Sequence, residues 1–475
     1  MRFTLKDVKE AVKGDAHILQ ECLENRISGA VIDSRLVKKD SVFLATVGEK
    51  VDAHKFIGQV FEKGAALVIT EKTPEEVEKL YGVDKSLWGN FILVKDAFIS
   101  LKEIAKCYRE TLNIPVVGIT GSVGKTSTKE FIAGVLSAKY NVLKTEGNFN
   151  NEIGVPLTLM RITEDTEVAV VEMGISDFEE MHRLSDMVKP DIAVITNIGN
   201  CHLENLGDRD GVLRAKTEIF DNMRETGTVI LNGDDDKLIT VDKNRTPGGR
   251  EPIFFGLEKG EKKTAWAENV INRKLFGSEA EICIGKDRLK ANIPMPGIHM
   301  VINATAAALV GRVLGLSDDE ILNGISSVRA LPGRNNIIKC PGYVLIDDCY
   351  NANPASMESS LDLLMMADTY KAAILGDMFE LGENSDSLHR KVGEYAASTG
   401  IDRLICVGKN SINMYNGAKK INPAMDVRYY EEVGKLVDDI KENRENIIPN
   451  SATVLVKASH GMKFTENLIE LLKVL

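Results

Sequence analysis

A glycine-rich stretch that follows an apolar run and leads into a helix-like segment constrains this chain more than any other feature. Residues 118–130 read GITGSVGKTSTKE, and the apolar run VVGIT covers 116–120. In such an arrangement, backbone amides and a helix N-terminus face phosphate oxygens, a lysine adds a mobile cation, and the next hydroxyl serves a Mg²⁺ ion. The predicted ATP-binding residues of this loop are Gly121, Ser122, Gly124, Lys125, Thr126 and Ser127.

The spacing of this loop departs from the common GxxxxGK[ST] pattern. Its upstream glycine is Gly118, seven residues before Lys125, and Ile119 stands where the common pattern has glycine. A tight turn between a strand and a helix would explain two glycines, but it does not explain the GKT ending. We therefore favour nucleotide binding over a purely structural turn.

Short apolar runs alternate with helix-like segments along the chain, which is typical of mostly parallel sheets joined by crossover helices. The predicted fold class is therefore α/β, and 475 residues suggest about three domains. We predict a small α/β N-terminal domain over 1–112, a central P-loop-type domain over 113–334 and a Rossmann-like C-terminal domain over 335–475. The central sheet should be mostly parallel with helices on both faces. The runs EPIFFG, EICIG and LKANIPM, between 252 and 295, should extend it with antiparallel strands.

Composition and charge limit the partners of the chain. Its net charge of -11 argues against a nucleic-acid or anionic-membrane surface, because both need a cationic face. No apolar stretch approaches the roughly 20 residues that cross a bilayer, and the N-terminus lacks the apolar core of a signal peptide. The seven cysteines form no CxxC pair, which fits free thiols in a reducing compartment. We expect a cytoplasmic monomer without membrane insertion.

Polar residues at the ends of apolar runs predict where the chemistry takes place. The carboxyl ends of parallel strands share one edge of a sheet, so the ends of VVGIT, AVVEMG, IAVITNIG and TVILNGDDD should converge there. A triphosphate beside a carboxylate needs charge compensation, and Thr126, Glu172 and His202 offer ligands for Mg²⁺, of which we expect two ions. By themselves, Glu172 also fits a solvated strand end and His202 a loop histidine. Lys216, in RAKTEIF, looks like an ordinary helix-surface lysine.

A series of further motifs follows in order along the chain. They are DSR (33–35), GNFNNEIGVP (147–156), EMG (172–174), TNIGNCHLENLG (196–207), RAKTEI (214–219), GIHMVINA (297–304), LPGR (331–334), DDCYNANP (347–354) and GDMFELG (376–382). Together with the phosphate loop, this series resembles the Mur ligase family over nearly the whole chain. DDCYNANP and GDMFELG resemble the dipeptide-adding branch of that family.

The resemblance implies a reaction and its reactants. It implies ATP-dependent ligation of D-alanyl-D-alanine to UDP-N-acetylmuramoyl-tripeptide through an acyl phosphate, which is a step in making peptidoglycan precursors. The implied cofactors are ATP, Mg²⁺ and a carbamate that CO2 forms on Lys216, which turns a cation into a carboxylate-like metal ligand. The resemblance further implies that the C-terminal domain closes over ATP and binds the dipeptide.

The resemblance also implies roles for residues of the matching motifs. The implied catalytic residues are Lys125, Glu172, His202 and Lys216, and the implied metal ligands are Thr126, Glu172, His202 and Lys216. Beyond the phosphate loop, ATP would be contacted by Asn232, Asn303, Arg334 and Asp348. DSR and GEKVDAHKF (48–56) resemble a uridine-nucleotide site, and GNFNNEIG resembles a wall that meets the muramyl peptide. The implied substrate-binding residues are Ser34, Arg35, Asn148, Asn150, Asn151, Asn351 and Asn353.

Five positions depart from the motifs of the family. Ala53 and Glu179 stand where glycine is usual, and Asn200 stands where glutamate is common. In VKASH (456–460), Ala458 and His460 replace the glycine and arginine of a VKGSR-like strand end. None of these changes removes a predicted metal ligand, but His460 leaves open whether a cation contacts substrate there at neutral pH.

Two other functions are compatible with the phosphate loop. A sister ligase such as a folylpolyglutamate synthetase would share the ATP site, but the first domain with its DSR motif argues against it. A nucleotide-binding switch protein would explain GKT, but it gives no reason for substrate-like motifs on both flanking domains. We therefore favour the dipeptide ligase.

Overall fold

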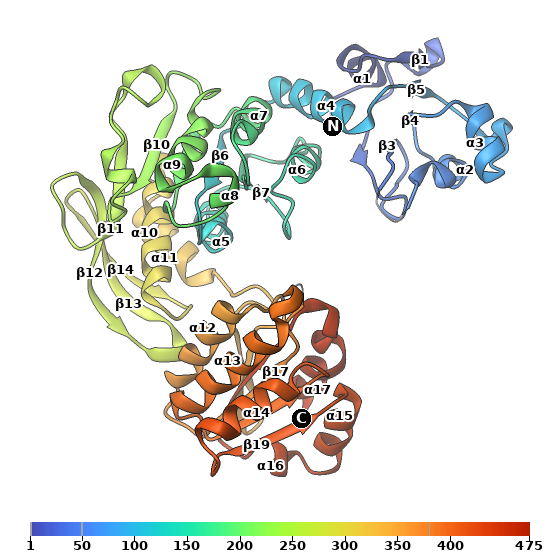
Figure 1. The fold of residues 1–475 in the computed structure, drawn as a ribbon. Helices are drawn as coiled ribbons and strands as arrows, with labels where there is room; N and C mark the ends of the chain where they lie inside the picture. Colours follow the sequence, from blue (N-terminus) through green and yellow to red (C-terminus); the bar gives the residue numbers. More distant parts are fainter. Residues whose placement is uncertain (1, 49–50, 380) are drawn as a thin grey trace. The chain divides into compact units, whose positions relative to one another are not determined.

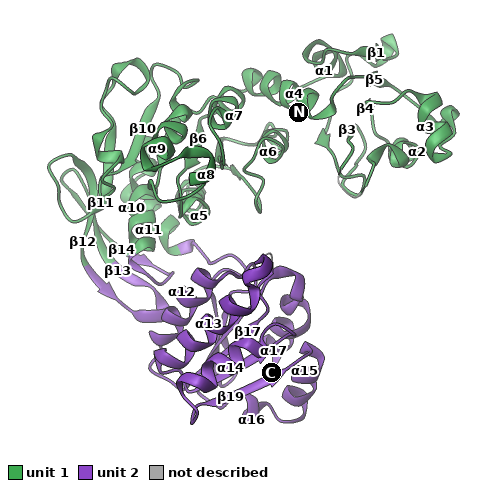
Figure 2. Cartoon of the chain, viewed as in Figure 1, with its two compact units in different colours: residues 1–269, 280–291, 299–326 green, residues 270–279, 292–298, 327–475 purple. Residues whose placement is uncertain are grey.

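The chain forms three sheets with helices packed against them (Figure 1). The computed structural model describes residues 2–48, 51–379 and 381–475. It divides into two compact units, one with residues 1–269, 280–291 and 299–326, the other with residues 270–279, 292–298 and 327–475 (Figure 2). The predicted α/β class is confirmed. None of the helices in the described part of the chain has the length and apolar character needed to cross a bilayer.

The first sheet of unit 1 has five strands. Their order is β1 (Asp15–His17), β5 (Phe91–Leu93), β4 (Leu67–Thr70), β3 (Ser41–Ala45) and β2 (Gly29–Val31). All neighbours pair in parallel except β1, which is antiparallel to β5. The helices of this part are α1 (Leu5–Ala11), α2 (Ile57–Glu62) and α3 (Pro74–Tyr81). The motifs DSR and DAH therefore follow β2 and β3 at the carboxyl edge of the sheet.

Helix α4 (Ala97–Thr111) joins this sheet to the central one. Asp96 accepts a hydrogen bond from the backbone N–H of Ile99 at 2.9 Å and so caps the start of the helix. Buried residues recur at helical spacing along one face, namely Leu101, Ile104, Ala105 and Tyr108. Near the end of the helix, the buried Arg109 forms an ion pair with Asp191 at 3.2 Å. These contacts fix the helix onto the central domain.

The central sheet has nine strands, which belong mostly to unit 1, and its parallel part carries the phosphate loop. The order is β14 (Asp287–Ile293), β13 (Ser278–Ile284), β12 (Lys263–Asn272), β11 (Ile253–Leu257), β10 (Thr228–Asn232), β9 (Ile192–Ile195), β6 (Val116–Thr120), β8 (Val168–Glu172) and β7 (Val142–Lys144). The strands from β12 to β7 pair in parallel. The associated helices are α5 (Lys125–Leu136), α6 (Gly154–Leu159), α7 (Glu180–Val188), α8 (Leu203–Leu206), α9 (Arg209–Thr217), α10 (Ile298–Val313) and α11 (Asp318–Ser327).

The prediction that antiparallel strands extend this sheet was wrong for the first of them, β11. Strand β11 is parallel to β10, and β12 is parallel to β11. The sequence did not predict β12 at all, because only Ala265, Trp266 and Ala267 of its ten residues are buried and charged residues interrupt the apolar pattern. An apolar run also carries no information about strand direction.

Unit 2 contains a six-stranded sheet with helices on both faces. The order is β15 (Asn336–Cys340), β16 (Tyr343–Asp347), β20 (Thr453–Lys457), β17 (Lys371–Gly376), β18 (Arg403–Val407) and β19 (Asp426–Tyr430). Only β15 pairs antiparallel. The helices are α12 (Pro354–Met365), α13 (Ser385–Thr399), α14 (Ile412–Ile421), α15 (Val433–Glu442), α16 (Arg444–Ile447) and α17 (Glu470–Val474). Two separate hydrophobic clusters cover the two faces, as expected for a Rossmann-like sheet.

Candidate active site

The phosphate loop connects β6 to α5 and passes very close to the end of β9. Gly121 has a φ of 149°, and a Cβ atom at this position would lie 1.9 Å from Oγ1 of Thr196. Gly124 has a left-handed φ of 83° and is the N-cap of α5. Both positions therefore require glycine. At Gly121 a side chain would not fit, and at Gly124 the backbone has a left-handed conformation.

The loop is held in place by the segment that follows β9. The backbone N–H of Val123 donates to Oδ1 of Asn197 at 3.0 Å, and Nδ2 of Asn197 donates back to the carbonyl of Val123 at 3.0 Å. The backbone N–H of Gly199 donates to Oγ of Ser122 at 2.8 Å. These bonds fix the loop by its outer residues and leave the amides around Gly124 at the start of the helix, where a phosphate would bind.

Lys125 folds back over its own loop. Its Nζ donates to the carbonyls of Gly121 at 2.8 Å and Ser122 at 3.3 Å. Burial lowers the pKa of Lys125. On the next turn of the helix, the hydroxyl of Thr128 donates to Oδ1 of Asn303 at 3.0 Å, which brings α10 against the loop. The predicted ATP residue Asn303 thus lies beside the phosphate loop.

Glu172, at the end of β8, offers an oxygen atom for a cation. Its Oε1 accepts hydrogen bonds from Oγ1 of Thr126 at 3.2 Å and from Nδ2 of Asn150 at 2.9 Å. Its Oε2 is buried and has no hydrogen-bond partner among the described residues. A buried carboxylate oxygen without a partner is costly unless a ligand completes its environment. The side chains of Glu172 and Thr126 therefore fit Mg²⁺, which prefers oxygen ligands.

His202 and Lys125 line one pocket of about 610 Å³ together with Asn150 and Asn151. The backbone of His202 is left-handed, with a φ of 53°, and its side chain is exposed. Asn151 Oδ1 accepts the backbone N–H of Gly154, the first residue of α6, at 2.9 Å. The described residues contain no group of three or more His, Cys, Asp or Glu side chains able to hold a metal by themselves. A metal here would need further ligands from the substrate or from other residue types.

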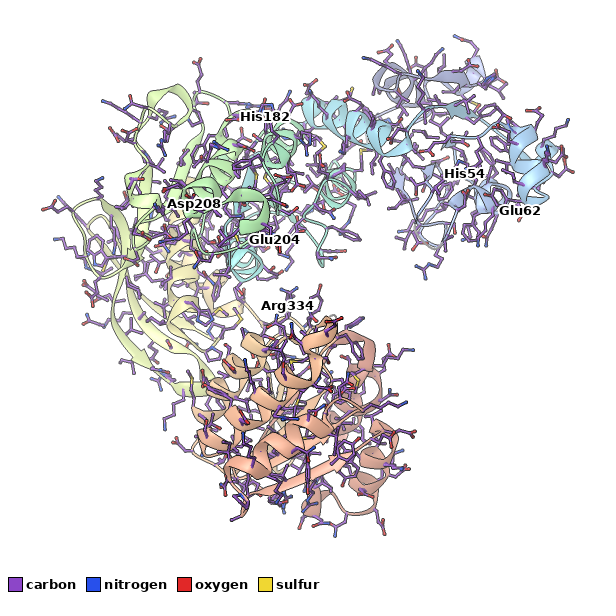
Figure 3. All side chains as sticks on the ribbon, in the orientation of Figure 1. His54, Glu62, His182, Glu204, Asp208 and Arg334 are labelled. Atoms are coloured by element: carbon purple, nitrogen blue, oxygen red, sulfur yellow. The ribbon has the colours of Figure 1, made fainter. Side chains whose placement is uncertain are left out.

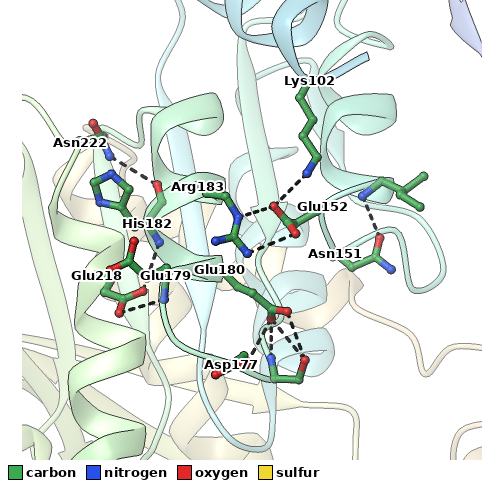
Figure 4. A network of polar contacts seen from close by, with 12 residues as sticks. Lys102, Asn151, Glu152, Asp177, Glu179, Glu180, His182, Arg183, Glu218 and Asn222 are labelled. Carbon is green, nitrogen blue, oxygen red and sulfur yellow. Dashed lines mark hydrogen bonds and ion pairs between the residues drawn. The ribbon is translucent and has the colours of Figure 1, made fainter. Parts of the chain in front are cut away.

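Two carboxylates that line this pocket, Glu152 and Glu180, belong to a network of polar contacts (Figure 4). Glu152 accepts hydrogen bonds from Nζ of Lys102 at 3.0 Å and from Nε of Arg183 at 2.7 Å, so it joins α4 to α7. Glu180 accepts the backbone N–H of Ser176 at 2.7 Å. Lys102, Glu152 and Glu180 thus bring one cation and two carboxylates to the lining of the pocket.

Lys216 is not the surface lysine that its sequence suggested. Only 1% of its surface is exposed, and burial together with the neighbouring ammonium of Lys125 lowers its pKa to about 8. The sequence did contain a signal for this burial, because Val212, Ala215 and Ile219 form an apolar stripe at helical spacing. Lys216 occupies one position of that stripe. It therefore points into the core beside the phosphate loop.

The NGDD stretch, which begins at the last residue of β10, supports the same edge of the central sheet. Nδ2 of Asn232 donates to the carbonyl of Thr196 at 2.9 Å, and Oδ2 of Asp235 accepts the backbone N–H of Ile198 at 2.8 Å. Asn232 therefore supports the segment that holds the phosphate loop.

The predicted uridine-site residues lie on the first sheet. Arg35 is exposed and paired with Asp33 at 2.7 Å, whereas Ser34 is buried. In the second motif, Glu49 and Lys50 lie outside the described residues, and His54 (Figure 3) is buried against Asp52, with 2.5 Å between Nδ1 and Oδ1. Burial lowers the pKa of His54. Asp52 thus holds His54 inside the domain.

Four predicted residues belong to unit 2. The guanidinium of Arg334 (Figure 3) lies 4.0 Å from the ring centre of Tyr350. Asp348 is buried and pairs with Lys457 at 2.5 Å. Asn351 lines a pocket of about 340 Å³, and Asn353 caps α12 by accepting a backbone hydrogen bond at 2.9 Å. Glu380, within GDMFELG, lies outside the described residues.

Comparisons with known proteins test the resemblance. The family model of the Mur ligase middle domain matches residues 119–311, and the one described as Mur ligase, glutamate ligase domain, matches residues 333–460. The UDP-N-acetylmuramoyl-tripeptide--D-alanyl-D-alanine ligase of Bacillus subtilis (strain 168) is 34% identical over 479 residues, which cover 99% of this chain and 98% of that protein.

Two solved structures extend this similarity to the fold. A crystal structure of MurF from Acinetobacter baumannii has a TM-score of 0.85 and 28% identity, and covers 99% of this chain and 98% of that chain. The structure of MurF ligase from Thermotoga maritima in complex with ADP has a TM-score of 0.71 and 27% identity, and covers 94% and 97%. The chain therefore belongs to the Mur ligase family.

Proposed function

We propose that this enzyme joins D-alanyl-D-alanine to UDP-N-acetylmuramoyl-tripeptide at the expense of ATP, giving UDP-N-acetylmuramoyl-pentapeptide, ADP and phosphate. The observation that carries the proposal is a single pocket lined by the phosphate-loop residue Lys125 and by Asn150 and Asn151 of the motif that resembles a peptide wall. A γ-phosphate and a peptide acid would meet there. The name of the full-length relative from Bacillus subtilis supports the same reaction.

The chemistry has two steps. The terminal carboxylate of the tripeptide attacks the γ-phosphorus of ATP, the bond to ADP breaks, and an acyl phosphate forms. The amine of the dipeptide then attacks the acyl carbon, inorganic phosphate leaves, and the amine loses a proton. Lys125 and the loop amides stabilise the charge that moves onto the phosphate oxygens. Most of the rate gain comes from holding the reactants in line, because three separate molecules need not collide.

Mg²⁺ would supply neutralisation of the triphosphate charge. We assign its ligands to Thr126, Glu172, His202 and a carbamylated Lys216, and we expect two ions. The open Oε2 of Glu172 supports this assignment. Carbamate formation needs a neutral amine, and the pKa of about 8 for Lys216 supplies a sizeable neutral fraction near physiological pH. NMR with ¹³C-labelled bicarbonate tests it: a carbamate signal is expected that Lys216→Ala abolishes.

The three parts of the chain receive separate roles. We assign residues 1–112, with Ser34 and Arg35, to the uridine nucleotide, residues 113–334 to ATP, and residues 335–475 to the dipeptide. The hydrogen bonds of Asn232 and Asn303 around the phosphate loop support the second role. For Arg334 and Asp348, contact with ATP rests on the resemblance alone. Since ATP and UDP-linked sugars are cytoplasmic compounds, the proposed reaction belongs in the cytoplasm.

Release of phosphate, measured with each substrate omitted in turn, tests the proposal. Full activity should require ATP, Mg²⁺, UDP-N-acetylmuramoyl-tripeptide and D-alanyl-D-alanine together. Lys125→Ala should lower turnover by at least ~1,000-fold, because the phosphate charge loses its partner. Phosphate release that continues without tripeptide and dipeptide would instead indicate a hydrolytic switch and would refute the ligase.

A further inference from the structure

A buried lysine that the proposed mechanism does not use lies directly behind the phosphate loop. Lys129 is on α5, one turn after Lys125, and only 1% of its surface is exposed. A buried ammonium persists only where anions compensate its charge, so its partners define its role.

Two carboxylates face this ammonium. Nζ of Lys129 lies 3.2 Å from Oε1 of Glu130 and 3.7 Å from Oε2 of Glu172. The other oxygen of Glu130 is paired with Lys144, which is partly exposed. Among the described residues, Lys129 is the only cation within ion-pair distance of Glu172.

The oxygen of Glu172 that faces Lys129 is the one that lacks a hydrogen-bond partner among the described residues. Oε1 of Glu172 accepts hydrogen bonds from Thr126 and Asn150, whereas Oε2 has no hydrogen-bond partner among the described residues. At 3.7 Å, the ammonium attracts Oε2 without forming a hydrogen bond. Any cation that takes this oxygen must therefore share the carboxylate with a lysine that cannot move into water.

We propose that Lys129 is an internal counter-ion that competes with divalent cations for Glu172 and keeps the metal site weak until ATP adds negative charge. The inference rests on the proposed function, which assigns Glu172 to the metal. Like charges repel more strongly in a buried site than in water, so a second cation beside Lys129 is disfavoured in the nucleotide-free protein. Lys129 thereby makes metal occupancy depend on the nucleotide.

Titration of the nucleotide-free, full-length protein with Mn²⁺, followed by electron paramagnetic resonance, measures this competition. Lys129→Met removes the competing charge and should tighten Mn²⁺ binding at least ~10-fold. The matched control, Lys144→Met, removes a lysine from the same network but not from Glu172, and should change binding less than ~3-fold. Unchanged or weaker binding by Lys129→Met overturns the proposal, because removing a lysine that merely orients Glu172 would cost metal affinity.

A second variant tests the opposite direction and covers a Lys129→Met protein that does not fold. Glu130→Gln leaves Glu172 as the carboxylate partner of Lys129, so Mn²⁺ binding should weaken about 10-fold. Unchanged or tighter binding by this variant overturns the proposal. Mn²⁺ titration of the wild-type protein with a non-hydrolysable ATP analogue distinguishes an error in the metal ligands from an error in the role of Lys129. If no Mn²⁺ binds when the analogue is present, the assignment of the metal ligands is also wrong. If Mn²⁺ binds but the variants do not behave as expected, only the proposed role of Lys129 is wrong.

Discussion

Glu179 adopts a backbone conformation that favours glycine. It is the N-cap of α7, with a φ of 66°, and its N–H donates to Oε1 of Glu218 at 3.2 Å. A side chain in this conformation costs about 1 kcal/mol, so Glu179→Gly should raise the free energy of unfolding by up to ~1 kcal/mol while keeping the backbone hydrogen bond. Urea denaturation measures the change. Glu180→Gly, one position into the helix, should lower it instead, and equal signs for both variants would contradict the argument.

Lys216 predicts how stability depends on pH. Its pKa falls from 10.5 to about 8 in the folded chain, chiefly because it is buried. Between about pH 8 and pH 10.5 the unfolded chain binds more protons than the folded chain, so the free energy of unfolding rises with pH. Below about pH 8 the folded chain buries a charged ammonium, and the full cost of that burial lowers the free energy of unfolding. In CO2-free buffer, Lys216→Met should therefore stabilise the ligand-free protein at pH 7 by roughly 2–3 kcal/mol and flatten the rise above pH 8. If the free energy of unfolding depended on pH in the same way in Lys216→Met and in the wild-type protein, the amine would stay charged in the folded chain.

At the scale of single residues, sequence reasoning found the side chains that belong to a recognisable motif. Lys125, Thr126 and Glu172 were predicted, and the structure brings them to one edge of the central sheet. The burial of Lys129 and Lys216 was not predicted from the sequence. For Lys216 the apolar stripe around it was available, whereas burial of Lys129 depends on the carboxylate of a distant strand.

At the scale of elements, the phosphate loop between β6 and α5 has no space for a side chain at Gly121. A Cβ there would lie 1.9 Å from Oγ1 of Thr196, so Gly121→Ala must push the loop away from β9. We expect a loss of about 2–4 kcal/mol of stability and loss of nucleotide binding. Calorimetric titration with ADP and urea denaturation measure both. Gly121→Ala combined with Thr196→Ala should recover part of the stability, and a purely additive double variant would contradict the steric explanation.

The elements themselves were predictable where burial is continuous. Strands β6, β8, β9 and β10 are buried along nearly their whole length, and their apolar runs predicted them correctly. Strands β12, β15 and β19 were missed because they are half exposed or lie at a sheet edge, where polar residues interrupt the run. Their place in a sheet is decided by neighbouring strands, which a single sequence window does not contain.

At the scale of the whole molecule, the proposed sites for the peptide acid and for the dipeptide lie on different units. The phosphate loop and the pocket beside it belong to unit 1, whereas the pocket lined by Tyr350, Asn351 and His460 belongs to unit 2. The family resemblance implies this assignment of roles, because matching motifs occur in both units. If the proposed assignment holds, the two half-reactions can be separated by substitution.

Asn351 is the residue at which to separate them. Its backbone carbonyl accepts Nζ of Lys457 at 3.1 Å, so Asn351→Ala removes the side chain from the pocket and keeps that anchor. Hydroxylamine traps the acyl phosphate formed from ATP and tripeptide, and this yield should stay within about 2-fold, whereas pentapeptide formation should fall about 10-fold or more through a raised KM for the dipeptide. Lys125→Ala should abolish both. Should the trapped yield fall in parallel with the product in Asn351→Ala, Asn351 would take part in activating the acid, and its assignment to the dipeptide would be wrong.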